Sequence, residues 1–164
     1  ELIEMHDSIV KDSPEIVAVN KKDPFEPAGI SLIIEAHGEF IFEFFDCYSM
    51  CQEVLNKQPT LLLTEFNNYL SHLVFCFDNG INKCGENEGL GHLIRGTLDG
   101  YKMVQHKFKE QLSCNEDVMR IYTELRIRES YGIGCDKESK LSVICKYKDL
   151  ANTLVELDFH ANAT

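Results

Sequence analysis

Four side chains in the first half of the chain have the residue types of a zinc site. Cys47 and Cys51 are four residues apart, as are His72 and Cys76, and this spacing places each pair on one face of a helix. Three cysteines with one histidine form an accepted ligand set for structural zinc. However, a helical hairpin that turns near Gln58 offsets the two pairs by several residues, at about 1.5 Å each. We therefore predict neither a metal site nor a cofactor.

The other motifs do not predict catalysis either. The glycine-rich run at residues 89–92 differs from a phosphate-binding loop, because its third glycine is misplaced and no strand precedes it. Glu35, Glu39 and Glu43 lie opposite the apolar face of their helix, which indicates a solvated surface rather than acid–base chemistry. His37 falls within that apolar face and is interpreted as a core histidine. No serine occupies a Gly-x-Ser-x-Gly elbow, so we predict that the protein is not an enzyme.

The elements that must position these side chains are predicted to be helices. Apolar residues recur at alternating intervals of four and three, as one face of a packed helix requires. Pro59 ends the first helix, and Asn115 is a suitable N-cap for the fourth. The expected helices cover residues 30–55, 60–77, 90–112, 116–131 and 137–159. Short loops between them predict an all-α, up-and-down bundle over residues 28–164, preceded by an irregular or extended segment at residues 1–27.

Three glycines make the first half of the third helix unusual. Gly91, Gly96 and Gly100 each cost about 1 kcal/mol relative to alanine inside a helix. This half is therefore expected either to be broken or to pack unusually closely against a neighbour.

Composition limits the classes of partner. The chain has 164 residues, of which 44% are hydrophobic and 26% charged, as in one ordinary globular domain. The formal charge of −11 repels nucleic-acid phosphates, so we expect no nucleic-acid partner. The longest unbroken apolar run is only Leu73–Phe77, which excludes a transmembrane helix.

The number of cysteines favours an oxidising compartment. Seven is a high count for a cytosolic protein. The alternative is a reduced protein in which several buried thiols act as small hydrophobic side chains. At most three bridges can form within the chain, and the odd thiol offers a route to oligomers. Two pairs, Cys76 with Cys84 and Cys135 with Cys145, lie near enough in sequence to close locally. The candidate disulfide residues are Cys47, Cys51, Cys76, Cys84, Cys114, Cys135 and Cys145. Asn162 also begins a triplet with the form of a glycosylation acceptor.

Charge is distributed unevenly along the chain. Residues 120–148 hold seven basic and four acidic side chains, whereas residues 27–78 hold seven acidic side chains and one lysine. A polarised surface favours a charged protein partner or head-to-tail self-association, and two solvated faces remain an equal alternative. The residues predicted to recognise an acidic partner are Arg120, Arg126, Arg128 and Lys146.

Aromatic side chains form a seam between the first three predicted helices. They either fill the core or line a pocket for a small apolar ligand. The residues of this aromatic seam are Phe40, Phe44, Phe66, Tyr69, Leu73, Tyr101 and Phe108.

The cysteine spacing resembles that of a known family. Cys47-x3-Cys51, Cys76-Phe77 with Lys83-Cys84, Phe108 before Cys114, and then Cys135 and Cys145 together resemble the cysteine-rich helical domains of secreted nematode proteins over roughly residues 40–150. The resemblance implies a disulfide-stapled binding or signalling module and assigns no site residue.

Three hypotheses for function follow. The first is a secreted, disulfide-stapled helical module that binds a protein partner. The second is a carrier of a small apolar ligand in a helical pocket. The third is an intracellular helical adaptor with reduced thiols.

Overall fold

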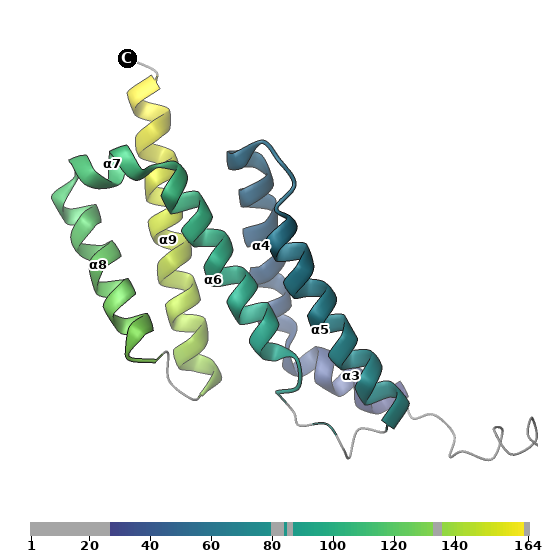
Figure 1. Cartoon of the computed structure of the whole chain (residues 1–164). Helices are drawn as coiled ribbons and strands as arrows, with labels where there is room; N and C mark the ends of the chain where they lie inside the picture. The colour runs from purple at the N-terminus through teal and green to yellow at the C-terminus, as the bar shows by residue number, and fades with distance from the viewer. Residues whose placement is uncertain (1–26, 80–83, 85–86, 133–135, 163–164) are drawn as a thin grey trace, which may run out of the picture.

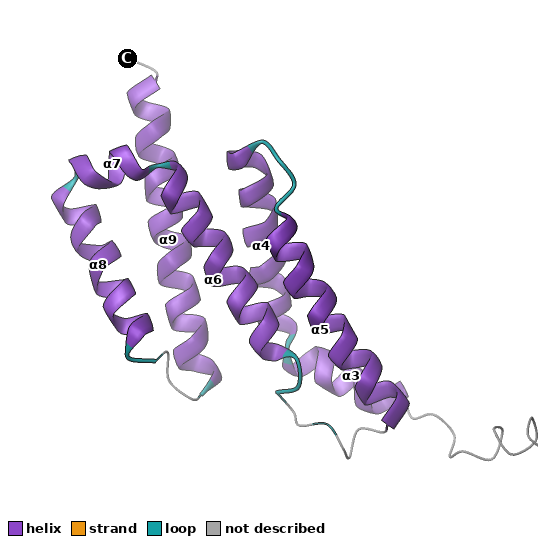
Figure 2. Cartoon of the chain, viewed as in Figure 1, coloured by secondary structure: helices purple, strands orange, loops and turns teal. Residues whose placement is uncertain are grey.

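A computed structural model of the chain describes residues 27–79, 84, 87–132 and 136–162. All regular secondary structure in these residues is helical, which confirms the all-α prediction (Figure 2). The predicted N-terminal segment, residues 1–27, lies outside the described residues except for Pro27. The described helices are α3 (Pro27–Ala36), α4 (Gly38–Leu55), α5 (Thr60–Asn79), α6 (Leu90–Lys107), α7 (Lys109–Cys114), α8 (Glu116–Ser130) and α9 (Lys137–Asn162).

Two of the predicted helices are each divided in two. The helix expected over residues 30–55 breaks at His37, which precedes Gly38 and whose buried imidazole Nδ1 lies 3.3 Å from the Tyr69 hydroxyl on α5. The helix expected over residues 90–112 breaks at Phe108, whose ring is buried in the core. In both cases a side chain from the break packs into the interior. A glycine adjoins the break at His37, whereas neither glycine nor proline adjoins the break at Phe108.

Helix α6 lies at the centre of the bundle. It packs against α4 and α5 on one side and against α9 on the other, while α8 packs on α9 (Figure 1). Consecutive long helices run in opposite directions, as predicted. The fourth predicted helix is α8. It begins at the predicted cap, where the Asn115 side chain accepts a hydrogen bond of 3.1 Å from the Val118 backbone N–H.

Two glycines allow α4 and α6 to approach closely. A Cβ at Gly96 would lie 2.6 Å from Phe44 Cε2, and a Cβ at Gly100 would lie 2.5 Å from Cys47 Sγ. The sulfur atoms use this proximity, since Cys47 donates to the Thr97 carbonyl at 3.3 Å and Cys51 donates to the Gly100 carbonyl at 3.2 Å. Of the two expectations for this half of α6, close packing is confirmed.

The structure contains one of the two predicted local bridges. A disulfide joins Cys76, near the end of α5, to Cys84 in the segment that leads to α6. Cys145 is an exposed free thiol, and its suggested partner Cys135 lies outside the described residues. Cys47, Cys51 and Cys114, also candidate disulfide residues, are free thiols as well. The neighbouring Cys51 side chain and burial both raise the pKa of Cys47, which keeps it a protonated, unreactive thiol.

A pair of glycine substitutions on α6 tests the close approach. Gly100→Ala should destabilise the protein by about 1–3 kcal/mol, because its methyl group would overlap Cys47 and contact Leu62. Gly91→Ala is the matched control, since nothing lies within 4 Å of its added Cβ. It should instead stabilise the protein by up to about 1 kcal/mol through helix propensity. Urea unfolding measures both changes, and equal effects would contradict a packing role for Gly100.

Candidate functional site

The aromatic seam forms the hydrophobic core. Phe40, Phe44, Tyr69, Tyr101 and Phe108 are buried, and Phe66 and Leu73 are partly buried against them. The Phe44 and Phe66 rings are stacked with centroids 5.5 Å apart, and Phe66 lies 6.1 Å from Tyr69. These side chains fill one another's space, as expected of a core rather than of a ligand cavity. His37, predicted to be a core histidine, is completely buried among them.

The structure separates the four predicted basic residues into two groups. Arg128 from α8 and Lys146 from α9 line the same pocket. Arg120 lies outside that pocket and forms exposed ion pairs with Asp117 and Glu124 on its own helix. Arg126 points elsewhere and contacts Glu129 at 2.7 Å. Two of the four predicted residues therefore come together.

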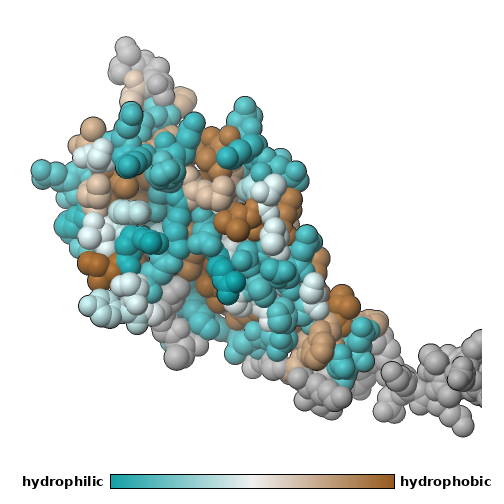
Figure 3. All heavy atoms as spheres, in the orientation of Figure 1, coloured by the Kyte–Doolittle hydropathy of each residue, from teal (hydrophilic) through white to brown (hydrophobic). Residues whose placement is uncertain are grey.

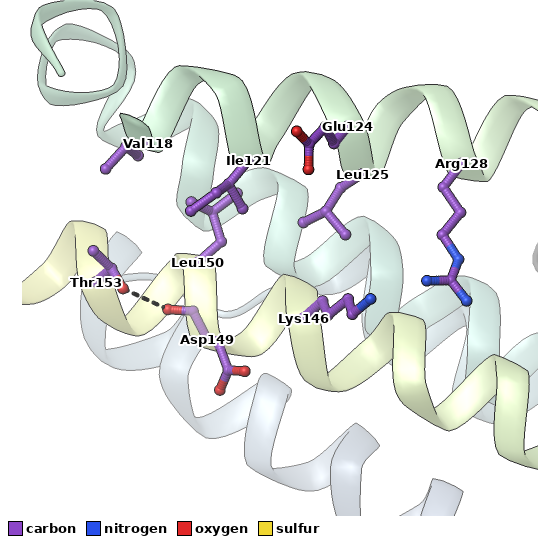
Figure 4. Close-up of a pocket in the computed structure, with 9 residues that line it drawn as sticks. All are labelled: Val118, Ile121, Glu124, Leu125, Arg128, Lys146, Asp149, Leu150 and Thr153. Atoms are coloured by element: carbon purple, nitrogen blue, oxygen red, sulfur yellow. Dashed lines mark hydrogen bonds between the residues drawn. The ribbon is translucent and has the colours of Figure 1, made fainter. Parts of the chain in front are cut away.

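The pocket that Arg128 and Lys146 share is an open groove of about 410 Å³ between α8 and α9 (Figure 4). Its floor is apolar, because Val118, Leu125 and Leu150 are buried there and Ile121 is 42% exposed beside them. The α8–α9 groove is lined by Val118, Ile121, Glu124, Leu125, Arg128, Lys146, Asp149, Leu150 and Thr153.

Helical spacing explains how each side of the groove is assembled. On α8, Val118, Ile121, Leu125 and Arg128 follow one another at intervals of three and four residues, so they lie along one helix face. On α9, the lining residues between positions 146 and 153 are likewise spaced so that they lie along one helix face. Which two faces meet is decided by the packing of α8 on α9.

The two cations of the groove have no ion-pair partner among the residues that the structure describes. Both side chains extend toward the same end of the groove (Figure 4). By contrast Lys148, two residues further along α9, turns toward α4 and contacts Glu43 at 3.1 Å and Asp46 at 2.6 Å. Arg128 and Lys146 are thus available to an anionic group, beside an apolar floor and two acidic residues of the same lining, Glu124 and Asp149.

A carboxylate that sequence reasoning missed holds α8 in place. Glu129 accepts hydrogen bonds from Lys102 of α6 at 2.6 Å, from Arg126 at 2.7 Å and from the Tyr147 hydroxyl of α9 at 2.8 Å. Burial raises the pKa of Glu129, but these hydrogen bonds and the charges of Lys102 and Arg126 outweigh it, so that the pKa lies below its usual value. This network therefore holds the part of α8 that carries Arg128 against α6 and α9.

Much of the remaining surface is hydrophilic, with hydrophobic side chains reaching the visible face in separate patches (Figure 3). No described helix is both long and apolar enough to cross a bilayer. Within the described ranges, no three His, Cys, Asp or Glu side chains form a group able to hold a metal ion. Asn162 is the last residue of α9, and residues 163–164 of its triplet lie outside the described part, so glycosylation stays a prediction.

The Glu129 network predicts a pH-dependent stability. A carboxylate with a lowered pKa stabilises the folded state at neutral pH, and this contribution is lost as the pH falls and the folded state takes up the proton. Glu129→Gln should therefore cost about 1.5–3 kcal/mol at pH 7 and progressively less toward pH 3. Glu124→Gln, at an exposed position on the same helix, is the control and should change little. Denaturant titrations across this pH range measure the difference, which would contradict the network if it did not vary with pH.

Comparison with family models, curated proteins and solved structures finds no match to this chain. The resemblance to secreted nematode domains therefore stays a prediction.

Proposed function

We propose that this protein is a secreted, disulfide-stapled helical module that binds an acidic, amphipathic segment of a partner protein in the α8–α9 groove. The observation that carries the proposal is the position of Arg128 and Lys146, which lack ion pairs with described residues and flank an apolar floor. By contrast, Arg120 and Arg126 have acidic partners on their own helix.

The shape and lining of the groove favour a helical occupant. A groove between two antiparallel helices accepts an amphipathic helix whose apolar residues recur at intervals of three and four. Ile121 offers the exposed apolar surface for those residues, above a floor formed by the nearly buried Val118, Leu125 and Leu150. An acidic side chain on the same helix would then reach Arg128, whose planar guanidinium can bind a carboxylate through two hydrogen bonds.

The remaining charges of the molecule support an acidic partner at this position. Residues 27–78 hold seven acidic side chains and one lysine, which is a net charge of −6. An acidic partner is repelled by this half of the molecule and attracted by the groove cations, so the charge distribution would set its orientation. Long-range repulsion of this kind is strongest at low salt.

The disulfide supports the extracellular part of the proposal. Bridges such as Cys76–Cys84 form and persist in oxidising compartments and are rare in the cytosol. This bridge joins α5 to the segment before α6, so it stabilises the half of the bundle that does not contain the groove.

Binding can be tested with defined peptides. The probe is a fluorescently labelled helical peptide with leucines at intervals of three and four and glutamates on the flanking positions. It should bind the full chain, and versions with glutamine or lysine in place of glutamate should bind progressively more weakly, by about two- to fivefold for each lost ion pair. Fluorescence anisotropy measures the affinities, and added salt should reduce the differences.

Two arginine substitutions on α8 separate the groove from general charge effects. Arg128→Glu should weaken binding of the glutamate peptide well beyond the effect of Arg120→Glu, although both variants change the net charge equally. Equal effects of the two variants, or equal binding of all three peptides, would contradict the proposal. Binding of dodecanoate without binding of any peptide would instead favour a carrier of small apolar ligands.

The disulfide gives a prediction about compartment and stability. Non-reducing peptide mapping of the protein from its natural source should recover the Cys76 and Cys84 peptides linked together. Cys84→Ser should lower the free energy of unfolding by about 2–3 kcal/mol, because the bridge no longer restricts the unfolded chain. Recovery of Cys76 and Cys84 as free thiols would argue for the intracellular adaptor.

A further inference from the structure

A second cluster of polar side chains lies away from the groove, where α5 faces the beginning of α6. His72 of α5 and His92 of α6 have ring centroids 5.1 Å apart. Each ring contacts a carboxylate through Nδ1, since His72 lies 2.6 Å from Glu88 and His92 lies 2.6 Å from Glu65. The two histidines therefore form a pair in which each imidazole has its own acidic partner.

The carboxylates determine which ring nitrogen remains available. An ionised carboxylate only accepts hydrogen bonds, so Nδ1 of each histidine must carry the proton. In the neutral imidazole this leaves the lone pair on Nε2, for which the described residues provide no hydrogen-bond partner. The His72 and His92 side chains are 40% and 22% exposed, so solvent can reach both.

We propose that His72 and His92 together bind one divalent transition-metal ion, Zn²⁺ or Cu²⁺, through their Nε2 atoms. A zinc–nitrogen distance of about 2.0–2.1 Å places the ion about 3.2 Å from each ring centroid. Two such rings at a tetrahedral angle have centroids about 5.2 Å apart. The separation of 5.1 Å between the His72 and His92 centroids is compatible with such a shared ion.

The carboxylates give the pair the outer contacts of a metal site. A histidine that binds a metal commonly donates its other N–H to a carboxylate, which orients the ring and makes the ligating nitrogen more basic. Here Glu88 has that role for His72 and Glu65 has it for His92. Glu65 is only 10% exposed and its second oxygen lies 3.6 Å from Arg95, so its position is restrained.

The backbone before α6 holds the other carboxylate in position. Gly89 has a positive φ of 76°, and a Cβ there would lie 3.0 Å from both His72 and Tyr69. A glycine is thus required where this segment crosses α5. The Cys76–Cys84 disulfide restrains the same connection four residues before Glu88. The backbone at Gly89 and the disulfide thus restrain the position of Glu88 in the metal-free protein.

The ligand set defines what the site can bind. Because no third His, Cys, Asp or Glu completes a ligand group among the described residues, the chain supplies two nitrogen ligands and water or a partner supplies the rest. Imidazole nitrogen suits Zn²⁺ and Cu²⁺, whereas Mg²⁺ and Ca²⁺ prefer oxygen. This site differs from the zinc set considered from sequence, since Cys76 is in a disulfide and Cys47 and Cys51 donate to α6.

Calorimetric titration of the metal-stripped full chain with Zn²⁺, and separately with Cu²⁺, tests the proposal. Cys114, Cys135 and Cys145 are first replaced by serine so that they cannot bind the ions, and the Cys76–Cys84 bridge is kept. One ion should bind per chain, and Mg²⁺ should not bind. His72→Gln and His92→Gln should each weaken binding at least tenfold, while His106→Gln, at an exposed position on α6, should leave it unchanged. Circular dichroism confirms that each variant is folded.

Two further readouts test the assignment of roles. Glu88→Gln should weaken binding about 10- to 100-fold with both histidines still present, because it removes only the orienting carboxylate. In the nuclear magnetic resonance spectrum, substoichiometric Cu²⁺ should broaden the ring signals of His72 and His92 before those of His106 and His160. Absence of binding to the parent chain would overturn the proposal. So would binding that survives the double variant His72→Gln/His92→Gln.

Discussion

The close approach of α4 to α6 is the constraint on which the other contacts of the bundle depend. Gly96 and Gly100 have no side chain, so Phe44 and Cys47 occupy the space beside them. The Cys47 and Cys51 thiols then donate to carbonyl oxygens of α6, which accept a second hydrogen bond there. With α4 packed this closely on it, α6 is the central helix against which α5 and α9 also pack (Figure 1). The helix propensity lost at the two glycines is offset by this burial.

Around this core, polar links determine which charges stay available at the surface. Glu129 joins α8 to α6 and α9, and Lys148 joins α9 to α4. Because these contacts occupy Arg126 and Lys148, they leave Arg128 and Lys146 as the cations beside the α8–α9 groove. The same packing of neighbouring helices brings His72 to His92 on the other side of α6. The groove and the histidine pair share no residue, so binding of a partner and binding of a metal ion can be examined independently.

The sequence by itself determined the local features, since helix formation, capping and short-range bridging depend on residues within a few positions of one another. The apolar spacing predicts the helices, Asn115 begins α8, Pro59 separates α4 from α5, and Cys76 bridges to Cys84. The glycines of α6 predict either a break or close packing because of their low helix propensity, and the structure shows close packing at Gly96 and Gly100. They do not indicate which helix approaches.

Only the tertiary structure decided the long-range features. The helix break at Phe108 is one of them, since no proline or glycine adjoins it and its ring is buried in the core; the break at His37 also has a glycine, Gly38, beside it. Arg120, Arg126 and Arg128 belong to one helix, yet only Arg128 reaches the groove, since neighbours distant in sequence determine which face of α8 is covered. Glu65 and Glu88 find their histidines across 27 and 16 residues of sequence. The helical spacing within one segment cannot predict such pairs, because they form only when separate helices have packed.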